Sequence, residues 1–581
     1  MPQKSASGAV KQVGGRKVAF SGKKKKDQLK MKRQKKAGIQ MGPAGDDASE
    51  GERELGDRVL RINDMGNPTG RNTRYALIFQ QQTKEEMDEI KKRVRRPFKF
   101  LGEEALYLVR DTDPLGMPRR PVWEHGWSKE KLDAHENKYF REFTRKLMQT
   151  QPSLSYFELN LETWRQLWRV IEMSDVLLLI ADVRYPLIHI PLSLLEYIGD
   201  LGKRVIIVLN KVDLVDPELA ASWITFLEKE HSGVKVIPFA SYAGCKAVGK
   251  HGRGKMRTPL HSCLALLDAV KSVLGSEAAK IDLSSWENKI REDCELHGSQ
   301  VDHDSELEVG EVIEQDDVVL SSRFQEGLFL TLGMLGHPNV GKSSLLNALM
   351  GKKVVSVSRT PGHTKHFQTI FLTKQLRLCD CPGLVFPTKH PRELQVVSGS
   401  FPIAQLRTPL AAVEYVAQRI HVERILRLPK VDTDESDWSA FEIAESWAEK
   451  RGFITARTGR PDVNRAAHHL LRMVLDGRTL CVAFRPPKEE HDQQPDKKLI
   501  NKILEIRGVK REALSDVDEN DESDVDSVDS EGGDGTADEE SGDNTGDNIS
   551  CKKGEASGAE KKIMNRFAAL VADDDDDDND E

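Results

Sequence analysis

Eight residues, Gly336 to Ser343, have the types and spacing of a loop that binds phosphate groups. Two glycines are separated by four residues and are followed directly by Lys342 and Ser343, which is the pattern of a phosphate-binding loop. The flanking elements are also those that this chemistry needs. An apolar run over residues 328–335 predicts a buried strand before the loop, and residues 344–350 predict a helix after it.

The chemistry of such a loop assigns a role to each part of it. Glycines let the backbone approach an anion closely, and successive backbone N–H groups at a helix N-terminus point at that anion. The ammonium group of Lys342 should reach the β- and γ-phosphates of a nucleotide, and the Ser343 hydroxyl should ligate Mg²⁺. The expected nucleotide contacts in this segment are Asn339, Val340, Gly341, Lys342, Ser343 and Ser344.

A second motif, Asn210-Lys211-Val212-Asp213, follows an apolar run over residues 205–209 that predicts a strand. Guanine presents its N1–H and its N2 amine side by side, so the Asp213 carboxylate can accept both hydrogen bonds. Adenine lacks both donors and would leave the carboxylate unpaired. Asn210 would tie this loop to the phosphate loop, and the Lys211 stem would cover one face of the base. The motif therefore predicts selectivity for guanine nucleotides.

A third segment matches a nucleotide motif more loosely. Residues 234–239 predict another strand, and this strand leads into Ala240 and Ser241. A loop at this place in the chain would support the guanine from the side opposite Asp213. We therefore count Ala240 and Ser241 among the expected nucleotide contacts.

A magnesium site is predicted from two segments after the phosphate loop. Residues 376–379 predict a strand that ends in Asp380-Cys381-Pro382-Gly383. An aspartate there lies near Mg²⁺ through a water molecule, and the glycine N–H faces the γ-phosphate. Either Thr360 or Thr364 should complete the magnesium shell, and we choose Thr364. The expected magnesium ligands are Ser343, Thr364 and Asp380, and the expected catalytic residues are Lys342, Thr364 and Gly383.

The order of these motifs along the chain is unusual. Small GTPases begin with the phosphate loop, and the guanine motif is the fourth of five. Here residues 210–213 and 239–241 come first, followed by the phosphate loop, Thr364 and Asp380, which is the order G4-G5-G1-G2-G3. A compact α/β sheet whose chain ends lie close together tolerates such a rotation. We therefore predict an α/β fold containing a circularly permuted P-loop GTPase domain.

The chain of 581 residues is long enough for two or three folded units with tails. Its composition and periodicity divide it into five parts. They are a basic disordered arm (1–45), a partly helical N-terminal extension (46–149), the permuted GTPase domain (150–395, with an acidic insert at 275–325), a helical C-terminal domain (396–487) and an acidic disordered tail (488–581). Within the insert, Trp286 is the one residue expected to anchor in a fold.

The two ends carry opposite charge although the formal net charge is only −7. The lysines of the arm suit contacts with RNA phosphates or a nuclear or nucleolar address, and a tail that only aids solubility is the alternative. The seven cysteines form no disulfide pattern, which predicts a reducing compartment. No apolar run is long enough to span a membrane and no secretory signal is evident, so we expect no membrane association.

As a set, these motifs resemble those of the circularly permuted GTPases of ribosome assembly. Residues 161–169, 182–186 and 358–364 carry the resemblance together with the guanine, phosphate and Asp-x-x-Gly motifs, and it covers residues 150–487. It implies binding of GTP and GDP with Mg²⁺ and slow intrinsic hydrolysis. It also implies work on pre-60S or 60S particles, through ribosomal RNA and ribosomal proteins. We further expect a monomer that acts in the nucleus or nucleolus and shuttles to the cytoplasm.

Three positions bear on how hydrolysis would be driven. Many GTPases keep a water-orienting Gln just after Asp-x-x-Gly, whereas Leu384 and Val385 here are apolar. The resemblance implies this substitution, so a partner or an ion must assist. Asn339 matches the position that holds K⁺ in potassium-activated relatives. The catalytic His proposed for bacterial relatives has no counterpart in residues 157–161, so that route has no support here.

The sequence thus predicts a Mg²⁺-dependent GTPase switch in assembly of the large ribosomal subunit. Two alternatives stay open. One is a regulatory scaffold that binds GTP without hydrolysing it, which the absent Gln favours. The other is a signalling GTPase unconnected with ribosomes, whose tails bind proteins. Because the segment after Gly383 leads directly into the helical C-terminal domain, we also expect the nucleotide state to be transmitted to that domain.

Overall fold

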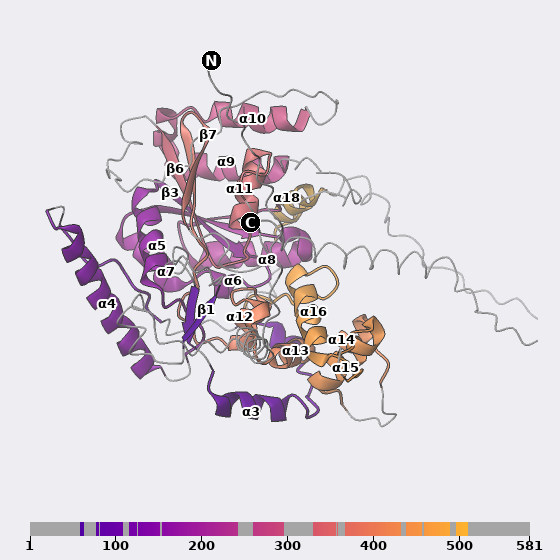
Figure 1. Ribbon diagram of the computed structural model, residues 1–581. Coiled ribbons are helices and arrows are strands. Elements are labelled where there is room, and N and C mark those ends of the chain that lie inside the picture. The colour runs from indigo at the N-terminus through magenta and orange to yellow at the C-terminus, as the bar shows by residue number, and fades with distance from the viewer. Residues whose placement is uncertain are drawn as a thin grey trace, which may run out of the picture. The chain divides into compact units, whose positions relative to one another are not determined.

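The structure is a computed structural model (Figure 1). It describes residues 59–62, 77–80, 82–108, 115–124, 126–151, 154–241, 259–295, 329–355, 357, 366–430, 437–455, 458–488 and 495–508. The basic arm, the tail beyond residue 508, residues 296–325 of the acidic insert and Thr364 lie outside this part of the chain. The sequence predictions made for those residues therefore stay predictions.

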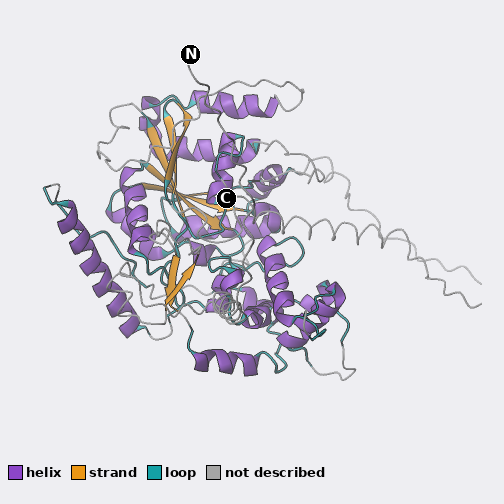
Figure 2. Ribbon diagram, in the orientation of Figure 1, coloured by secondary structure: helices purple, strands orange, loops and turns teal. Residues whose placement is uncertain are grey.

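A six-stranded sheet lies at the centre of the fold, among the helices (Figure 2). In spatial order its strands are β5 (Lys235–Pro238), β4 (Arg204–Asn210), β3 (Val176–Asp182), β6 (Leu330–Leu335), β8 (Leu376–Asp380) and β7 (Gln368–Thr373). Neighbouring strands are parallel except that β7 runs antiparallel to β8. Each strand predicted for this domain is present, with ends that differ by a residue or two.

Helices cover both faces of this sheet, which explains why its strands are almost wholly apolar. Alternate side chains of β3 point to opposite faces, so that Leu177 and Leu179 lie in one hydrophobic core and Leu178 and Ile180 in another. The first core includes side chains of α5 (Leu161–Met173), α7 (Leu192–Asp200) and α8 (Pro217–Glu230). The second includes side chains of α9 (Leu260–Leu274), α10 (Ser284–Glu295) and α11 (Lys342–Met350).

The N-terminal extension is partly ordered. Strands β1 (Val59–Ile62) and β2 (Leu77–Gln80) pair antiparallel, and they are followed by α3 (Lys84–Arg93), the 3₁₀ turn η3 (Glu103–Leu106) and α4 (Lys129–Thr150). The Ser128 hydroxyl caps α4 by accepting a hydrogen bond from the backbone N–H of Lys131. The sequence predicts no strand in this region, so β1 and β2 are additions.

The C-terminal region is helical, as predicted. It contains α12 (Arg392–Val397), η7 (Ile403–Gln405), α13 (Pro409–Ala417), α14 (Val422–Ile425), α15 (Ala440–Arg451) and α16 (Val463–Asp476), and the last four lie together (Figure 1). Helices α15 and α16 end at Gly452 and Gly477, both of which have left-handed backbone conformations.

Ordered helices extend past two of the predicted boundaries, at residues 275 and 488. Residues 275–295 form η5 (Gly275–Lys280) and α10, and the predicted anchor Trp286 is fully buried in the core. Residues 497–507 form α18 (Lys497–Arg507), which contacts α8 and α9 and buries Ile503 and Ile506. The acidic composition of the whole tail concealed this short amphipathic segment, whose apolar residues recur at helical spacing.

Two expectations from composition can be compared with the described residues. Cys263, Cys379, Cys381 and Cys481 are free thiols there, and all except Cys481 are fully buried. Burial raises the pKa of the Cys381 thiol to about 12, so it is a packing residue rather than a reactive one. In these same ranges, no helix is long and apolar enough to cross a bilayer.

Candidate nucleotide site

The carboxyl ends of four neighbouring parallel strands bring the predicted motifs to one edge of the sheet. Strand β4 ends at Asn210, β6 leads into the phosphate loop and β8 ends at Asp380. Strand β3 lies between β4 and β6 and ends at Asp182. This edge is where open α/β sheets bind their ligands. Segments separated by more than a hundred residues in the sequence therefore meet at one site.

The phosphate loop wraps around its own lysine. The Lys342 ammonium donates hydrogen bonds to the carbonyl oxygens of Gly336 (3.1 Å) and His337 (2.6 Å). Burial lowers the pKa of Lys342, whereas the nearby Asp380 carboxylate opposes that shift. The loop thus holds the ammonium group above the start of α11, the arrangement expected of a lysine that binds phosphates.

The geometry of Asp380 fits a divalent cation. Ser343 donates a hydrogen bond from its hydroxyl to Asp380 Oδ2 at 2.8 Å. The other carboxylate oxygen, Oδ1, is buried and makes no hydrogen bond to any residue that the structure describes. Burial raises the pKa of Asp380 to about 6. A hard cation with oxygen ligands would supply the partner that this carboxylate lacks. Ser343 and Asp380 are therefore placed together as predicted, and Thr364 lies outside the described residues.

Gly383 lies directly against the phosphate loop. A Cβ atom at this position would lie 2.7 Å from Pro338 Cα and 3.1 Å from Lys342 Nζ. Such distances leave no room for any side chain. The segment that follows β8 is thus in contact with the loop predicted to hold the phosphates, where it can respond to what the loop binds.

The two guanine segments and the phosphate loop are joined through Asn210. Its side-chain amide donates a hydrogen bond to the Val340 carbonyl at 2.9 Å. Its Oδ1 accepts a hydrogen bond from the Ser241 hydroxyl at 3.3 Å. The backbone N–H of Ala240 donates to the Ser262 hydroxyl at 3.2 Å, a contact that the sequence did not predict. The tie that the sequence assigns to Asn210 is present in the structure.

The remaining residues of the guanine motif are held in a defined geometry. Lys211 has a left-handed backbone (φ 64°) and donates from its ammonium to the Asn339 carbonyl at 2.8 Å. Asp213 lies in the 3₁₀ turn η4 (Val212–Leu214) with its side chain exposed. The turn is fixed by backbone hydrogen bonds from Val212 to Phe239 and from Leu214 to Lys211. The carboxylate is therefore accessible to a base while its backbone is held in place.

One buried ion cluster was missed as a functional feature. Asp182 and Arg184 are fully buried, and Asp182 also binds the Lys211 ammonium at 2.8 Å. Although burial opposes it, the two neighbouring cations hold the pKa of Asp182 well below its usual range. The available signal was an Asp at the end of an apolar strand, followed two residues later by an Arg. Buried charges at such a place need partners, and here one partner belongs to the guanine motif.

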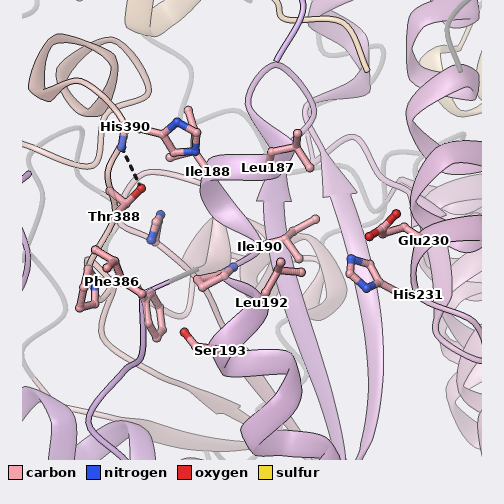
Figure 3. A pocket seen from close by; sticks show the side chains of 14 residues that line it. Leu187, Ile188, Ile190, Leu192, Ser193, Glu230, His231, Phe386, Thr388 and His390 are labelled. Atoms are coloured by element: carbon pink, nitrogen blue, oxygen red, sulfur yellow. Dashed lines mark hydrogen bonds between the residues drawn. The ribbon is translucent and has the colours of Figure 1, made fainter. Parts of the chain in front are cut away.

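A small cavity beside the phosphate loop was also missed. Its volume is about 70 Å³. Figure 3 shows Ile188, Ile190, Phe386, Thr388 and His390 around it, with the His390 backbone N–H bonded to the Thr388 hydroxyl. His337 also lines it, and neither ring nitrogen of this buried side chain has a hydrogen-bond partner among the described residues. Burial lowers the pKa of His337 well below its usual value, so the ring is neutral.

Comparison with known proteins decides the family. A family model described as 50S ribosome-binding GTPase matches residues 331–430. Guanine nucleotide-binding protein-like 1 of Homo sapiens is 40% identical over 481 residues, which are 76% of this chain and 78% of that protein. The chain belongs to this family. The Mus musculus protein of the same name is 40% identical over 479 residues, and Large subunit GTPase 1 of Schizosaccharomyces pombe is 33% identical over 452 residues.

The solved structures that match this member of the guanine nucleotide-binding protein-like 1 family are less similar to it than those relatives are. GNP-bound YlqF from T. maritima is 20% identical, with a TM-score of 0.32, and covers 56% of this chain and 99% of its own. A TM-score of that size does not establish a shared fold. The fold of the GTPase domain instead follows from the strand order and from the contacts of Asn210, Lys342 and Asp380 described above.

Proposed function

We propose that this protein binds GTP and GDP with Mg²⁺ and hydrolyses GTP to GDP and phosphate as a molecular switch. The hydrogen bond from Asn210 to the Val340 carbonyl supports this proposal most strongly. This bond joins two loops. The side chains of one are suited to bind guanine, and those of the other are suited to bind phosphates. Membership of a family of GTP-binding proteins points the same way.

Each side chain of the site then has a defined task. The Lys342 ammonium binds the β- and γ-phosphates, and the Gly383 N–H contacts the γ-phosphate. Ser343 and Asp380 would hold Mg²⁺, with Thr364 expected to complete its shell. When bound, Mg²⁺ neutralises charge that develops on the phosphates. Asp213 reads the edge of the base, and Asn210, Lys211, Ala240 and Ser241 shape its pocket.

Hydrolysis should be slow without a partner. Leu384 and Val385 stand where many GTPases keep a water-orienting Gln, and both are 1% exposed. The Val385 carbonyl is bound by the backbone N–H of Glu158. These two side chains are therefore packing residues that cannot orient water. A ribosomal partner or a K⁺ ion must supply the missing assistance.

The proposed process is assembly of the large ribosomal subunit. The description of the matching family model, 50S ribosome-binding GTPase, and the name of a similar protein, Large subunit GTPase 1, support this assignment. Arg465, Arg472 and Arg478 lie exposed on and just after α16, where they suit contacts with RNA phosphates. We propose a monomer that binds pre-60S or 60S particles, acts in the nucleus or nucleolus and does not associate with membranes.

A regulatory scaffold that binds GTP with little hydrolysis is the second candidate. The burial of Leu384 and Val385 favours it, because a packed apolar pair replaces the water-orienting group. A signalling GTPase without a ribosomal role is its variant. Both would share the nucleotide site but differ in turnover and in partner.

GTP turnover separates these candidates. We expect slow phosphate release from the full chain in KCl and at least a tenfold increase when purified 60S subunits are added, because activation in trans can supply the missing group. Control reactions contain 60S subunits alone. Tight GTP binding without stimulation would instead support the scaffold. Co-sedimentation with 60S particles should weaken steeply as salt rises if phosphate contacts dominate.

Potassium dependence tests the role proposed for Asn339. Its side-chain nitrogen donates to the Gly399 carbonyl at 2.9 Å, so Oδ1 is the side-chain oxygen that could ligate a cation. We expect GTP turnover to be several-fold faster in KCl than in NaCl, and we expect Asn339→Ala to remove that difference. Steady-state phosphate release at equal ionic strength measures both. Equal rates of the parent protein in the two salts would refute the role.

A further inference from the structure

Arg184 connects the nucleotide site to the helical C-terminal region. Its guanidinium binds both oxygens of Asp182, through Nε at 3.0 Å and Nη2 at 2.8 Å. The same guanidinium donates from Nη1 to the Val474 carbonyl at 2.9 Å and from Nη2 to the Leu475 carbonyl at 3.1 Å. Those carbonyls belong to the last turn of α16. A fully buried side chain of the sheet edge therefore caps a helix of the C-terminal region.

The charges of this cluster explain why the helix end belongs there. One carboxylate, Asp182, faces two cations, the fully buried Arg184 and the partly buried Lys211. The C-terminus of a helix carries partial negative charge on its unpaired carbonyl groups. The last turn of α16 therefore supplies the negative partner that this excess of positive charge requires. Removing α16 would leave buried guanidinium donors without acceptors, which is unfavourable.

Lys211 carries the connection from this cluster to the nucleotide loops. Its ammonium binds Asp182 and the Asn339 carbonyl, both at 2.8 Å. Arg184 fixes the Asp182 carboxylate, and the carboxylate fixes the Lys211 ammonium against the phosphate loop. A rotation of the carboxylate would release the lysine that is expected to cover the guanine.

A second contact joins the same two regions. The Asn339 side-chain amide donates to the Gly399 carbonyl, and a Cβ at Gly399 would lie 2.6 Å from Leu475 Cδ1. The end of α16, the segment around residue 399 and the phosphate loop are thus in direct contact. Two routes therefore lead from the loop to the last turn of α16, one through the hydrogen bonds of Lys211, Asp182 and Arg184 and one through the packing of Gly399 against Leu475.

We propose that the C-terminal end of α16 is part of the nucleotide site and that Arg184 is the positioning residue that couples them. Seated α16 holds Asp182 and Lys211 in place for guanine nucleotide binding. Bound nucleotide in turn stabilises the seated helix, because such coupling is reciprocal. A partner that draws α16 away from Arg184 therefore lowers nucleotide affinity and promotes nucleotide release. The inference rests on the proposed function and adds a means of regulating it.

Two helix-ending glycines provide a matched test. Gly477 and Gly452 end α16 and α15 with nearly equal left-handed angles, φ 72° and 68°. A Cβ at Gly477 would lie 2.5 Å from Arg184 Nη1, whereas a Cβ at Gly452 would meet no atom of the described residues within 4 Å. Alanine at either position introduces the same backbone strain. Only Gly477→Ala also pushes on the guanidinium of Arg184.

The experiment measures affinity for a fluorescent GDP analogue with the full chain. We expect Gly477→Ala to weaken binding about tenfold and Gly452→Ala to leave it unchanged. Arg184→Lys, which keeps the charge but loses the guanidinium fork, should act like Gly477→Ala. This second variant keeps the test decisive if Gly477→Ala does not fold. If Gly477→Ala or Arg184→Lys folds and binds the GDP analogue as tightly as the parent protein, the inference is overturned.

Hydrogen exchange separates coupling from a loss of general stability. In the parent protein, GDP should slow amide exchange over residues 463–477, and this protection should vanish in Gly477→Ala but persist in Gly452→Ala. If GDP slows amide exchange over residues 463–477 equally in both variants, the inference is also contradicted. A parent protein that does not bind GDP at all would instead contradict the proposed function.

Discussion

Replacing Asp213 with asparagine should weaken GTP binding by about 10²- to 10⁴-fold and create affinity for xanthosine triphosphate. The carboxylate is expected to accept two hydrogen bonds, from N1–H and the N2 amine of guanine. Each hydrogen bond to a charged group contributes about 1.5–3 kcal/mol, and two of them correspond to this range of affinity. An asparagine amide can accept one bond and donate another. It therefore suits xanthine, which has a carbonyl where guanine has its amine.

The surroundings of Asp213 indicate that this substitution leaves the fold of the turn unchanged. The side chain is exposed, and backbone bonds at Val212 and Leu214 hold the turn without using the carboxylate. Competition of GTP, XTP and ATP against a fluorescent GDP analogue measures the change. Asp216→Asn is the matched control, because Asp216 is exposed and precedes α8 without a side-chain capping bond. Unchanged GTP affinity in Asp213→Asn would show that the base is read elsewhere.

Local patterns predicted those parts of the site whose function depends on consecutive residues. The phosphate loop, the guanine motif and Asp380 were all found from short motifs that follow apolar strands. Their relative placement followed as well, because parallel strands in one sheet end at the same edge. The structure adds the hydrogen bonds of Asn210 and of Ser343 that realise this placement.

Contacts between distant segments could not be predicted in this way. Arg184 binds carbonyl groups about 290 residues further along the chain, and backbone acceptors leave no pattern in the sequence. Gln395 shows the same limit, because both atoms of its amide bind the backbone of Tyr156. Helix α18 was missed for a different reason, since an 11-residue amphipathic helix contributes little to the composition of a long acidic tail.

Glu158 should make the stability of the folded protein fall as pH rises from 6 to 8. The side chain is fully buried just before α5. Its Oε1 accepts hydrogen bonds from the backbone N–H groups of Ile78 (3.0 Å) and Asn160 (2.8 Å), and its Oε2 makes none within the described part of the chain. Burial raises its pKa to about 8 from an ordinary value of 4.5. The folded protein therefore holds a proton that the unfolded chain releases.

The sign of the effect follows from that difference in bound protons. The stabilisation from the raised pKa is fully present below about pH 4.5 and is lost as pH rises through about 8. Each pKa unit corresponds to about 1.4 kcal/mol, so the interval from pH 6 to 8 costs on the order of 2–3 kcal/mol. Glu158→Gln is neutral throughout and keeps the oxygen that accepts from Ile78 and Asn160. From pH 6 to pH 8, the free energy of unfolding of Glu158→Gln should therefore rise by that amount relative to the parent.

Urea unfolding at pH 6, 7 and 8 measures this change. Glu142→Gln, on the exposed side of α4, is the control and should follow the parent. If the free energies of unfolding of Glu158→Gln and the parent change equally with pH, ionisation of the Glu158 carboxyl does not destabilise the folded protein. The position matters because Glu158 joins two segments. Its carboxyl binds β2, while its backbone N–H binds the carbonyl of Val385, just after Gly383. Ionisation of this carboxyl would therefore loosen the segment expected to respond to the γ-phosphate.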